Sequence, residues 1–218
     1  MIVEVWSDIV CPWCYLGLAR FQKALDGFEH RNQVDVRHRS FELDPSIPRG
    51  QVSSVLDMLQ SKFGGTREQV LAQEERMASM AAAEGLGYVA DRPTGNTYDA
   101  HQLLHLATDR GLEDVVRAAL WREHFGAGRS VFTAEDLISI VVPAGLDHAE
   151  VEQVLKDDTY WEAVRTDEQR ASQLGITGVP FYVLGDVRRG DALGISGAQP
   201  AARFADALAK GWAEYIAA

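Results

Sequence analysis

The sequence has little positive charge and no long hydrophobic run. Its 21 basic side chains are outnumbered by 32 acidic ones, which gives a formal charge of −11. Nucleic-acid binding and docking on an anionic membrane both depend on basic patches, so we expect neither partner. No segment approaches the roughly 18 consecutive apolar residues that a membrane-spanning helix needs. With 46% hydrophobic residues, the chain can nevertheless bury a sizeable core.

Cysteine is also scarce, and the whole chain contains two. This number excludes the disulfide-rich secreted scaffolds. The first residues include Glu4 and Asp8, and no basic residue precedes Arg20. They therefore lack the basic start and the apolar stretch of a secretory signal, and we expect a cytoplasmic protein.

The beginning of the chain alternates between strand and helix patterns. Residues 2–6 are mostly strand formers, and an amphipathic helix is predicted from Pro12 to about Phe28. Residues 34–41 are predicted to form a second strand. A strand, a crossover helix and a second strand favour parallel pairing of the two strands.

The middle of the chain, residues 53–175, has the pattern of six or seven helices and no clear strand. Near the end, residues 181–184 and 193–196 are strand-like, residues 185–191 are turn-like, and Pro200 opens a last helix. The pattern predicts a small α/β domain made of residues 1–44 and 175–218, interrupted by an inserted helical domain of residues 45–174.

The two cysteines form the segment Cys11-Pro12-Trp13-Cys14. If Pro12 is the first helical residue, Cys11 is the N-cap and Cys14 lies in the first turn. A disulfide between them closes a very small ring and adds little stability, so a structural bond is poorly placed here. The unpaired N–H groups and the dipole of the helix favour a thiolate at Cys11. We therefore assign nucleophilic attack to Cys11 and the resolving role to Cys14.

Two other interpretations of the cysteines remain open at this point. Zinc needs four ligands, and His101 and His105, at helical spacing, are the residues that could complete a set with the cysteines. These histidines lie far along the chain in the helical block, so we expect no metal. The cysteines could also be buried and inert, which the strand-turn-helix context disfavours.

A second segment, Gly178-Val179-Pro180, precedes the predicted strand at residues 181–184. Proline is tolerated at the first residue of a strand because it cannot donate to the ladder. Together with the cysteine segment, this arrangement resembles the thioredoxin superfamily, and the long helical insertion resembles its DsbA-like branch. The ordered set of segments resembles the FrnE-type dithiol oxidoreductases: Ser7-Asp8, Phe41-Glu-Leu-Asp-Pro45, Asn96-Thr with Ala100-His101, Ala144-Gly-Leu-Asp147, Gly178-Val-Pro-Phe181 and Ser196-Gly-Ala-Gln-Pro200.

The resemblance implies an α/β fold with a thioredoxin-like core and a large all-helical insertion between the second and third core strands. It also implies that Pro180 is cis and that the backbone of Val179 pairs with an extended substrate beside Cys11. Pro12 and Trp13 are then expected to contribute to the substrate surface. The implied activity is that of a protein-disulfide oxidoreductase or isomerase.

Trp13 adds no charge between the cysteines, and the expected compartment is reducing, so we predict a reductase or isomerase. We expect no bound cofactor, with glutathione or a thioredoxin-type protein as a possible electron donor. The substrate is expected to be a disulfide-bearing protein, a peptide or a small thiol. The alternative is a glutathione-dependent transferase or isomerase of the kappa or 2-hydroxychromene-2-carboxylate type, in which Ser usually stands at the position of Cys11. The oligomeric state stays open.

Overall fold

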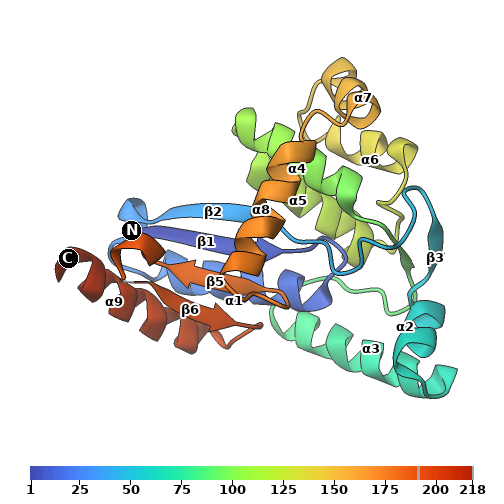
Figure 1. The fold of residues 1–218 in the computed structure, drawn as a ribbon. Helices are drawn as coiled ribbons and strands as arrows, with labels where there is room; N and C mark the ends of the chain where they lie inside the picture. The colour runs from blue at the N-terminus through green and yellow to red at the C-terminus, as the bar shows by residue number, and fades with distance from the viewer. Residues whose placement is uncertain (191, 218) are drawn as a thin grey trace. The chain divides into compact units, whose positions relative to one another are not determined.

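Both ends of the chain meet in one four-stranded sheet in the computed structural model, which describes residues 1–190 and 192–217 (Figure 1). The order is β2-β1-β5-β6, in which β1 pairs with β2 in parallel and β5 pairs antiparallel with β1 and β6. The predicted core strands and the parallel pairing are confirmed. Their bounds are β1 at Ile2–Ser7, β2 at Asp35–Ser40, β5 at Phe181–Leu184 and β6 at Leu193–Ser196.

The chain divides into two compact units. Residues 1–41 and 167–218 form the first, here called the core unit, and residues 42–166 form the second, the inserted unit. These boundaries differ from the ones expected after residues 44 and 174. The second boundary is earlier because it falls inside helix α8, Trp161–Gln173, whose later residues pack in the core unit. The predicted turn at 185–191 contains the short 3-10 helix η3, Val187–Arg189, and its last residue, Asp191, lies outside the described residues.

One face of the sheet is covered by α1, Pro12–Asp26, and α9, Ala201–Ala217. The register places Tyr182 opposite Val5, so both side chains point to this face. The Tyr182 ring lies 5.2 Å from that of Phe21 on α1 and 4.7 Å from that of Phe204 on α9. All of these side chains are buried, and their aromatic contacts fix α1 on the sheet. Helix α1 ends before the predicted Phe28 because Gly27 is its C-cap.

The other face of the sheet carries charge beneath an apolar cluster. The cluster joins Trp6 to Ala171 of α8, and the Trp6 indole N–H donates to the Asp167 carbonyl at 3.0 Å. Buried Glu4 lies beside it and pairs with Arg39 at 2.8 Å and with a second arginine, Arg170 of α8, at 2.5 Å. This network ties the end of α8 to the strands that support the cysteine segment.

The inserted unit is mainly helical but contains a two-stranded antiparallel sheet, β3–β4. The expectation of no strand in this region was wrong, because strands of three residues are too short to produce a readable alternation. The small 3-10 helix η1, Arg31–Gln33, belongs to the core unit. The elements of the inserted unit are β3 at Val52–Ser54, α2 at Val55–Phe63, α3 at Arg67–Ala83, β4 at Pro93–Gly95, α4 at Tyr98–Asp109, α5 at Glu113–Trp121, the π-helix η2 at Arg122–Gly126, α6 at Ala134–Val141 and α7 at His148–Asp157.

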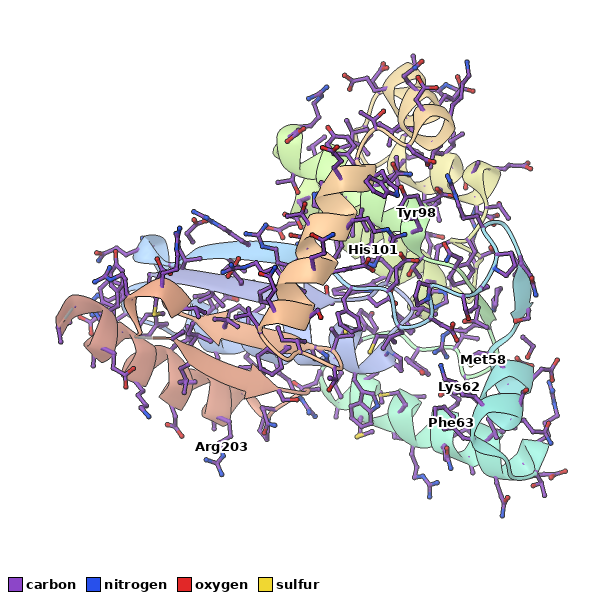
Figure 2. All side chains as sticks on the ribbon, in the orientation of Figure 1. Met58, Lys62, Phe63, Tyr98, His101 and Arg203 are labelled. Atoms are coloured by element: carbon purple, nitrogen blue, oxygen red, sulfur yellow. The ribbon has the colours of Figure 1, made fainter. Side chains whose placement is uncertain are left out.

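The helices of the inserted unit begin at residues suited to capping. Thr66 and Gln69 form a capping box at α3, and Thr133 caps α6 by accepting from the N–H of Asp136. Tyr98 and His101 lie on α4, labelled in Figure 2, and both are buried. None of the helices in the described part of the chain is long and apolar enough to cross a membrane.

Candidate dithiol active site

The cysteine segment lies at the junction of β1 and α1. Cys11 is the N-cap of α1 with an extended backbone, and Pro12 is in the first turn. The Cys11 carbonyl accepts from the N–H of Cys14 at 3.0 Å and from that of Tyr15 at 3.2 Å. The predicted N-cap position of Cys11 and first-turn position of Cys14 are therefore confirmed.

The two sulfurs differ in their surroundings. Both cysteines are free thiols, and 3% of Cys11 and 0% of Cys14 are exposed. Burial raises the pKa of the Cys14 thiol well above its ordinary value, and a hydrogen bond with Cys11 raises it further. Cys14 thus holds its proton at neutral pH and must lose it before it can attack.

The proline segment reaches the cysteines from the far end of the chain. The Val179–Pro180 peptide bond is cis, as the resemblance implied. The Cys11 thiol donates to the Val179 carbonyl at 3.7 Å, across 168 positions of sequence. The Pro180 carbonyl accepts from the N–H of Gly197 at 2.8 Å, which anchors the segment to the chain beyond β6. The fold therefore places the main chain of Val179 beside Cys11.

The remaining predicted residues lie at the edge of this group. Pro12 is partly buried, whereas 46% of Trp13 is exposed. An exposed indole next to a buried sulfur is an apolar contact surface that an incoming chain can cover. All of the predicted site residues lie in the core unit.

Two residues beside the cysteine segment, Gly17 and Tyr182, were not predicted from the sequence. Gly17 lies inside α1, and a Cβ built there would be 2.9 Å from the Tyr182 hydroxyl and 3.0 Å from Pro180 Cγ. The Tyr182 hydroxyl is buried and has no hydrogen-bond partner among the residues that the structure describes. A glycine in a helix interior costs about 1 kcal/mol relative to alanine, and that unfavourable choice was the readable signal of a close approach.

A metal centre was the main alternative for the cysteines. Within residues 1–190 and 192–217, no group of three or more His, Cys, Asp or Glu side chains is placed to hold a metal ion. His101 and His105 lie on α4 of the inserted unit, and the His105 ring stacks on Tyr160 at 6.1 Å.

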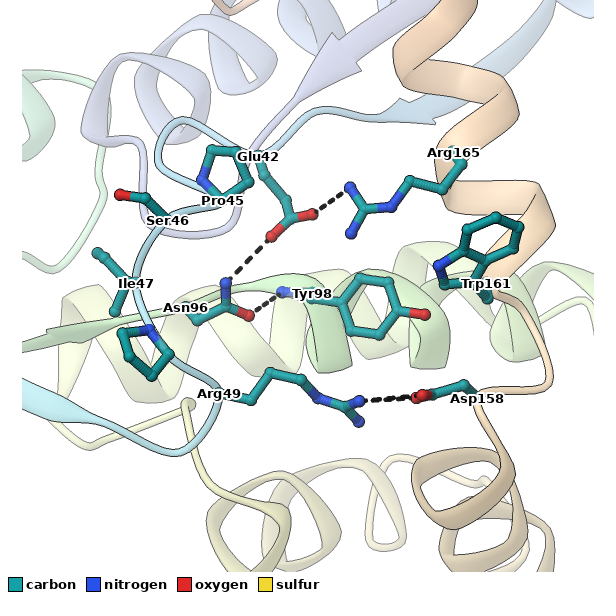
Figure 3. A pocket seen from close by; sticks show the side chains of 11 residues that line it. Glu42, Pro45, Ser46, Ile47, Arg49, Asn96, Tyr98, Asp158, Trp161 and Arg165 are labelled. Carbon is teal, nitrogen blue, oxygen red and sulfur yellow. Dashed lines mark hydrogen bonds and ion pairs between the residues drawn. The ribbon is translucent and has the colours of Figure 1, made fainter.

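The inserted unit contains a cavity of about 370 Å³. Figure 3 shows that its charged side chains bind one another. Glu42 accepts from Arg165 at 2.8 Å and from Asn96 at 3.2 Å, and Arg49 pairs with Asp158 at 2.9 Å. These pairs hold the segment after β2 to the beginnings of α4 and α8, so a structural role accounts for the charges.

Comparisons with known proteins identify the family and the fold of the chain. The family model of the DSBA-like thioredoxin domain matches residues 2–209. The crystal structure of a probable DsbA oxidoreductase from Streptomyces coelicolor is 50% identical, with a TM-score of 0.92, over 98% of this chain and 91% of that chain. The uncharacterised protein YwbO of Bacillus subtilis is 26% identical over 185 residues, which are 84% of this chain and 86% of YwbO. A 2-hydroxychromene-2-carboxylate isomerase, 16% identical with a TM-score of 0.66 over 96% of this chain and 95% of its own, shares the fold alone.

The fold and the family model define a mixed α/β thiol–disulfide oxidoreductase with a thioredoxin-like core. The chain belongs to the family of DSBA-like thioredoxin domains. Its activity is that of a protein-disulfide oxidoreductase or isomerase.

Proposed function

We propose that the chain is a FrnE-type reductase or isomerase that exchanges disulfides through Cys11 and Cys14 in the cytoplasm. One observation carries the proposal. Cys11 is at the N-cap of α1 against the Val179 carbonyl, while Cys14 is fully buried with a raised pKa. This asymmetry is what a nucleophile and a resolving thiol require.

The first step is attack by the Cys11 thiolate on a substrate disulfide. A bond forms between Cys11 Sγ and one substrate sulfur, and the other substrate sulfur leaves as a thiolate that takes up a proton. Cys11 lies at the positive end of the α1 dipole, which favours negative charge on the attacking sulfur. Once Cys11 has lost its proton it no longer donates to the Val179 carbonyl, which can then accept from a substrate N–H.

The second step releases the substrate. Cys14 loses its proton and attacks Cys11 Sγ, which forms the Cys11–Cys14 disulfide and expels the substrate sulfur as a thiolate. The substrate disulfide has then gained two electrons and the protein dithiol has lost them. A reductant of the glutathione or thioredoxin type must restore the dithiol in a reductase cycle. In an isomerase cycle, a second substrate thiol attacks the mixed disulfide instead, and the protein stays reduced.

The substrate class follows from the surface beside Cys11. The exposed indole of Trp13 and the main chain of Val179 suit an extended peptide that bears a disulfide. No bound cofactor is part of this chemistry, since both electrons reside in the two sulfurs.

The test is to trap the mixed disulfide with a disulfide-bonded peptide and analyse the products by mass spectrometry. Cys14→Ser is expected to accumulate a one-to-one adduct at Cys11, and Cys11→Ser is expected to form none. The unmodified chain should release reduced peptide and become oxidised. If Cys14→Ser, supplied with glutathione, still turned over substrate at the full rate of the unmodified chain, the proposal would be contradicted. That result would favour the glutathione-dependent transferase or isomerase, because such an enzyme needs no resolving thiol.

A further inference from the structure

A buried phenol that the exchange steps above do not use lies beside the dithiol. Tyr182 is on β5, and none of its surface is exposed. Its hydroxyl finds no hydrogen-bond partner in the part of the chain that the structure describes. A buried hydroxyl without a partner costs free energy, whereas phenylalanine would fill the same space without that cost.

The position of the hydroxyl is fixed from two sides. The ring is held between Phe21 of α1 and Phe204 of α9, at centroid distances of 5.2 and 4.7 Å. The hydroxyl then lies 2.9 Å from the point where a Cβ on Gly17 would be. Gly17 follows Cys14 by three positions on α1, so both face the same side of the helix.

Charge on the sulfurs acts on this phenol. Burial raises the pKa of Tyr182 well above its ordinary value, and negative charge on Cys14, followed by that on Cys11, raises it further. Tyr182 therefore remains protonated, and remains a donor, when Cys14 ionises. The other groups that act on Cys14 are Cys11 and Asp8. The Asp8 backbone hydrogen bond lowers the pKa of Cys14, whereas the Asp8 carboxylate raises it.

We infer that the Tyr182 hydroxyl stabilises the negative charge on Cys14 Sγ, by turning its O–H toward that sulfur as the sulfur becomes a thiolate. The inference rests on the proposed function, because it concerns the second step of the exchange. Cys14 gives up its proton to solvent or to a departing thiolate, and the rotating hydroxyl then stabilises the charge left on the sulfur. Tyr182 thereby lowers the barrier to attack on Cys11 Sγ, while the first step does not involve it.

The two steps can be timed separately with Ellman's reagent, an aromatic disulfide that releases a coloured thiolate at each step. Reduced protein should release one equivalent when Cys11 attacks and a second when Cys14 resolves the adduct. Tyr182→Phe is expected to slow the second release by about tenfold or more, because the O–H dipole that faces a buried charge is lost. The pH profile of the second release should also shift to higher pH, whereas the first release should keep its rate.

Tyr98→Phe is the matched control, because Tyr98 is also a buried tyrosine whose hydroxyl has no partner among the described residues, and it lies in the inserted unit. We expect this variant to leave both releases unchanged. Gly17→Ala, which crowds the hydroxyl while retaining it, should slow the second release too. If Tyr182 had a purely structural role, Tyr182→Phe would lower the unfolding temperature without changing the ratio of the two release rates.

A second release within about twofold of the unmodified rate in Tyr182→Phe would overturn the inference. That result would leave the proposed function standing as long as Cys14→Ser abolishes the second release. If Cys14→Ser kept it, the proposed function itself would fail, whatever Tyr182→Phe does.

Discussion

Substitution of Gly17 by alanine tests whether the contacts around the two cysteines are as close as the structure places them. Alanine at an interior helix position normally stabilises a protein by about 1 kcal/mol relative to glycine. At Gly17 the added Cβ would lie 2.9 Å from the Tyr182 hydroxyl, 3.0 Å from Pro180 Cγ and 3.2 Å from the Cα of Ala198. These distances are below van der Waals contact, and one of the atoms belongs to the main chain.

The magnitude follows from the two opposing effects. Overpacking a well-filled core costs typically about 1–3 kcal/mol, and the helix propensity of alanine returns about 1 kcal/mol. Gly17→Ala should therefore be neutral to about 2 kcal/mol less stable. Gly211 in α9 is the matched control, because its Cβ would first meet the flexible Met1 Sδ at 3.3 Å. We expect Gly211→Ala to be as stable as the unmodified chain or slightly more stable.

Urea unfolding of both variants, followed by circular dichroism, measures the difference directly. We expect Gly17→Ala to be less stable than Gly211→Ala by up to about 3 kcal/mol. A Gly17→Ala protein that gains about 1 kcal/mol would show open space beside the helix and would refute the packing described here.

Two further variants address pH dependence and substrate contact. Burial lowers the pKa of His124 to about 3, from 6.5 for a free side chain, so the unfolded chain takes up a proton that the folded chain does not. The contribution of His124 to the free energy of unfolding is fully present above pH 6.5 and decreases as the pH falls toward 3. Between pH 6.5 and 5, the unmodified chain should lose about 2 kcal/mol of stability more than His124→Gln, as measured by urea unfolding at several pH values; equal losses would refute this. Trp13→Ala should leave stability within about 0.5 kcal/mol but raise the KM for a disulfide-bearing protein more than that for a small disulfide. Equal changes in the two KM values, from steady-state kinetics, would remove Trp13 from the substrate surface.

The local parts of the site were predictable from the sequence because short-range rules determine them. Pro12 starts α1, and this fixes Cys11 at the N-cap and Cys14 in the first turn. The approach of Val179 to Cys11 came from the resemblance, since spacing alone says nothing about contacts across 168 positions.

The contacts that the sequence could not reveal are tertiary. The tyrosine in β5 reads as one more apolar strand residue, and only the packing of α1 brings its hydroxyl to the turn after Cys14. The expected domain boundary at residue 174 was displaced for a similar reason. Asp167 and Arg170 look like the polar face of a helix, yet they bind Arg39 and Glu4 of the core unit.

The proposed function requires that Cys11 and Cys14 form a reversible two-electron couple. Equilibration with glutathione buffers of known ratio, followed by quantification of free thiols, tests it most directly. We expect a single transition in which both thiols are lost together, at a potential on the reducing side of the oxidising DsbA-type proteins. This transition should be absent from Cys11→Ser and from Cys14→Ser. A chain whose thiols do not respond to the glutathione ratio would contradict the dithiol assignment. A reversible couple at a strongly oxidising potential would keep the site but contradict the reductase or isomerase direction.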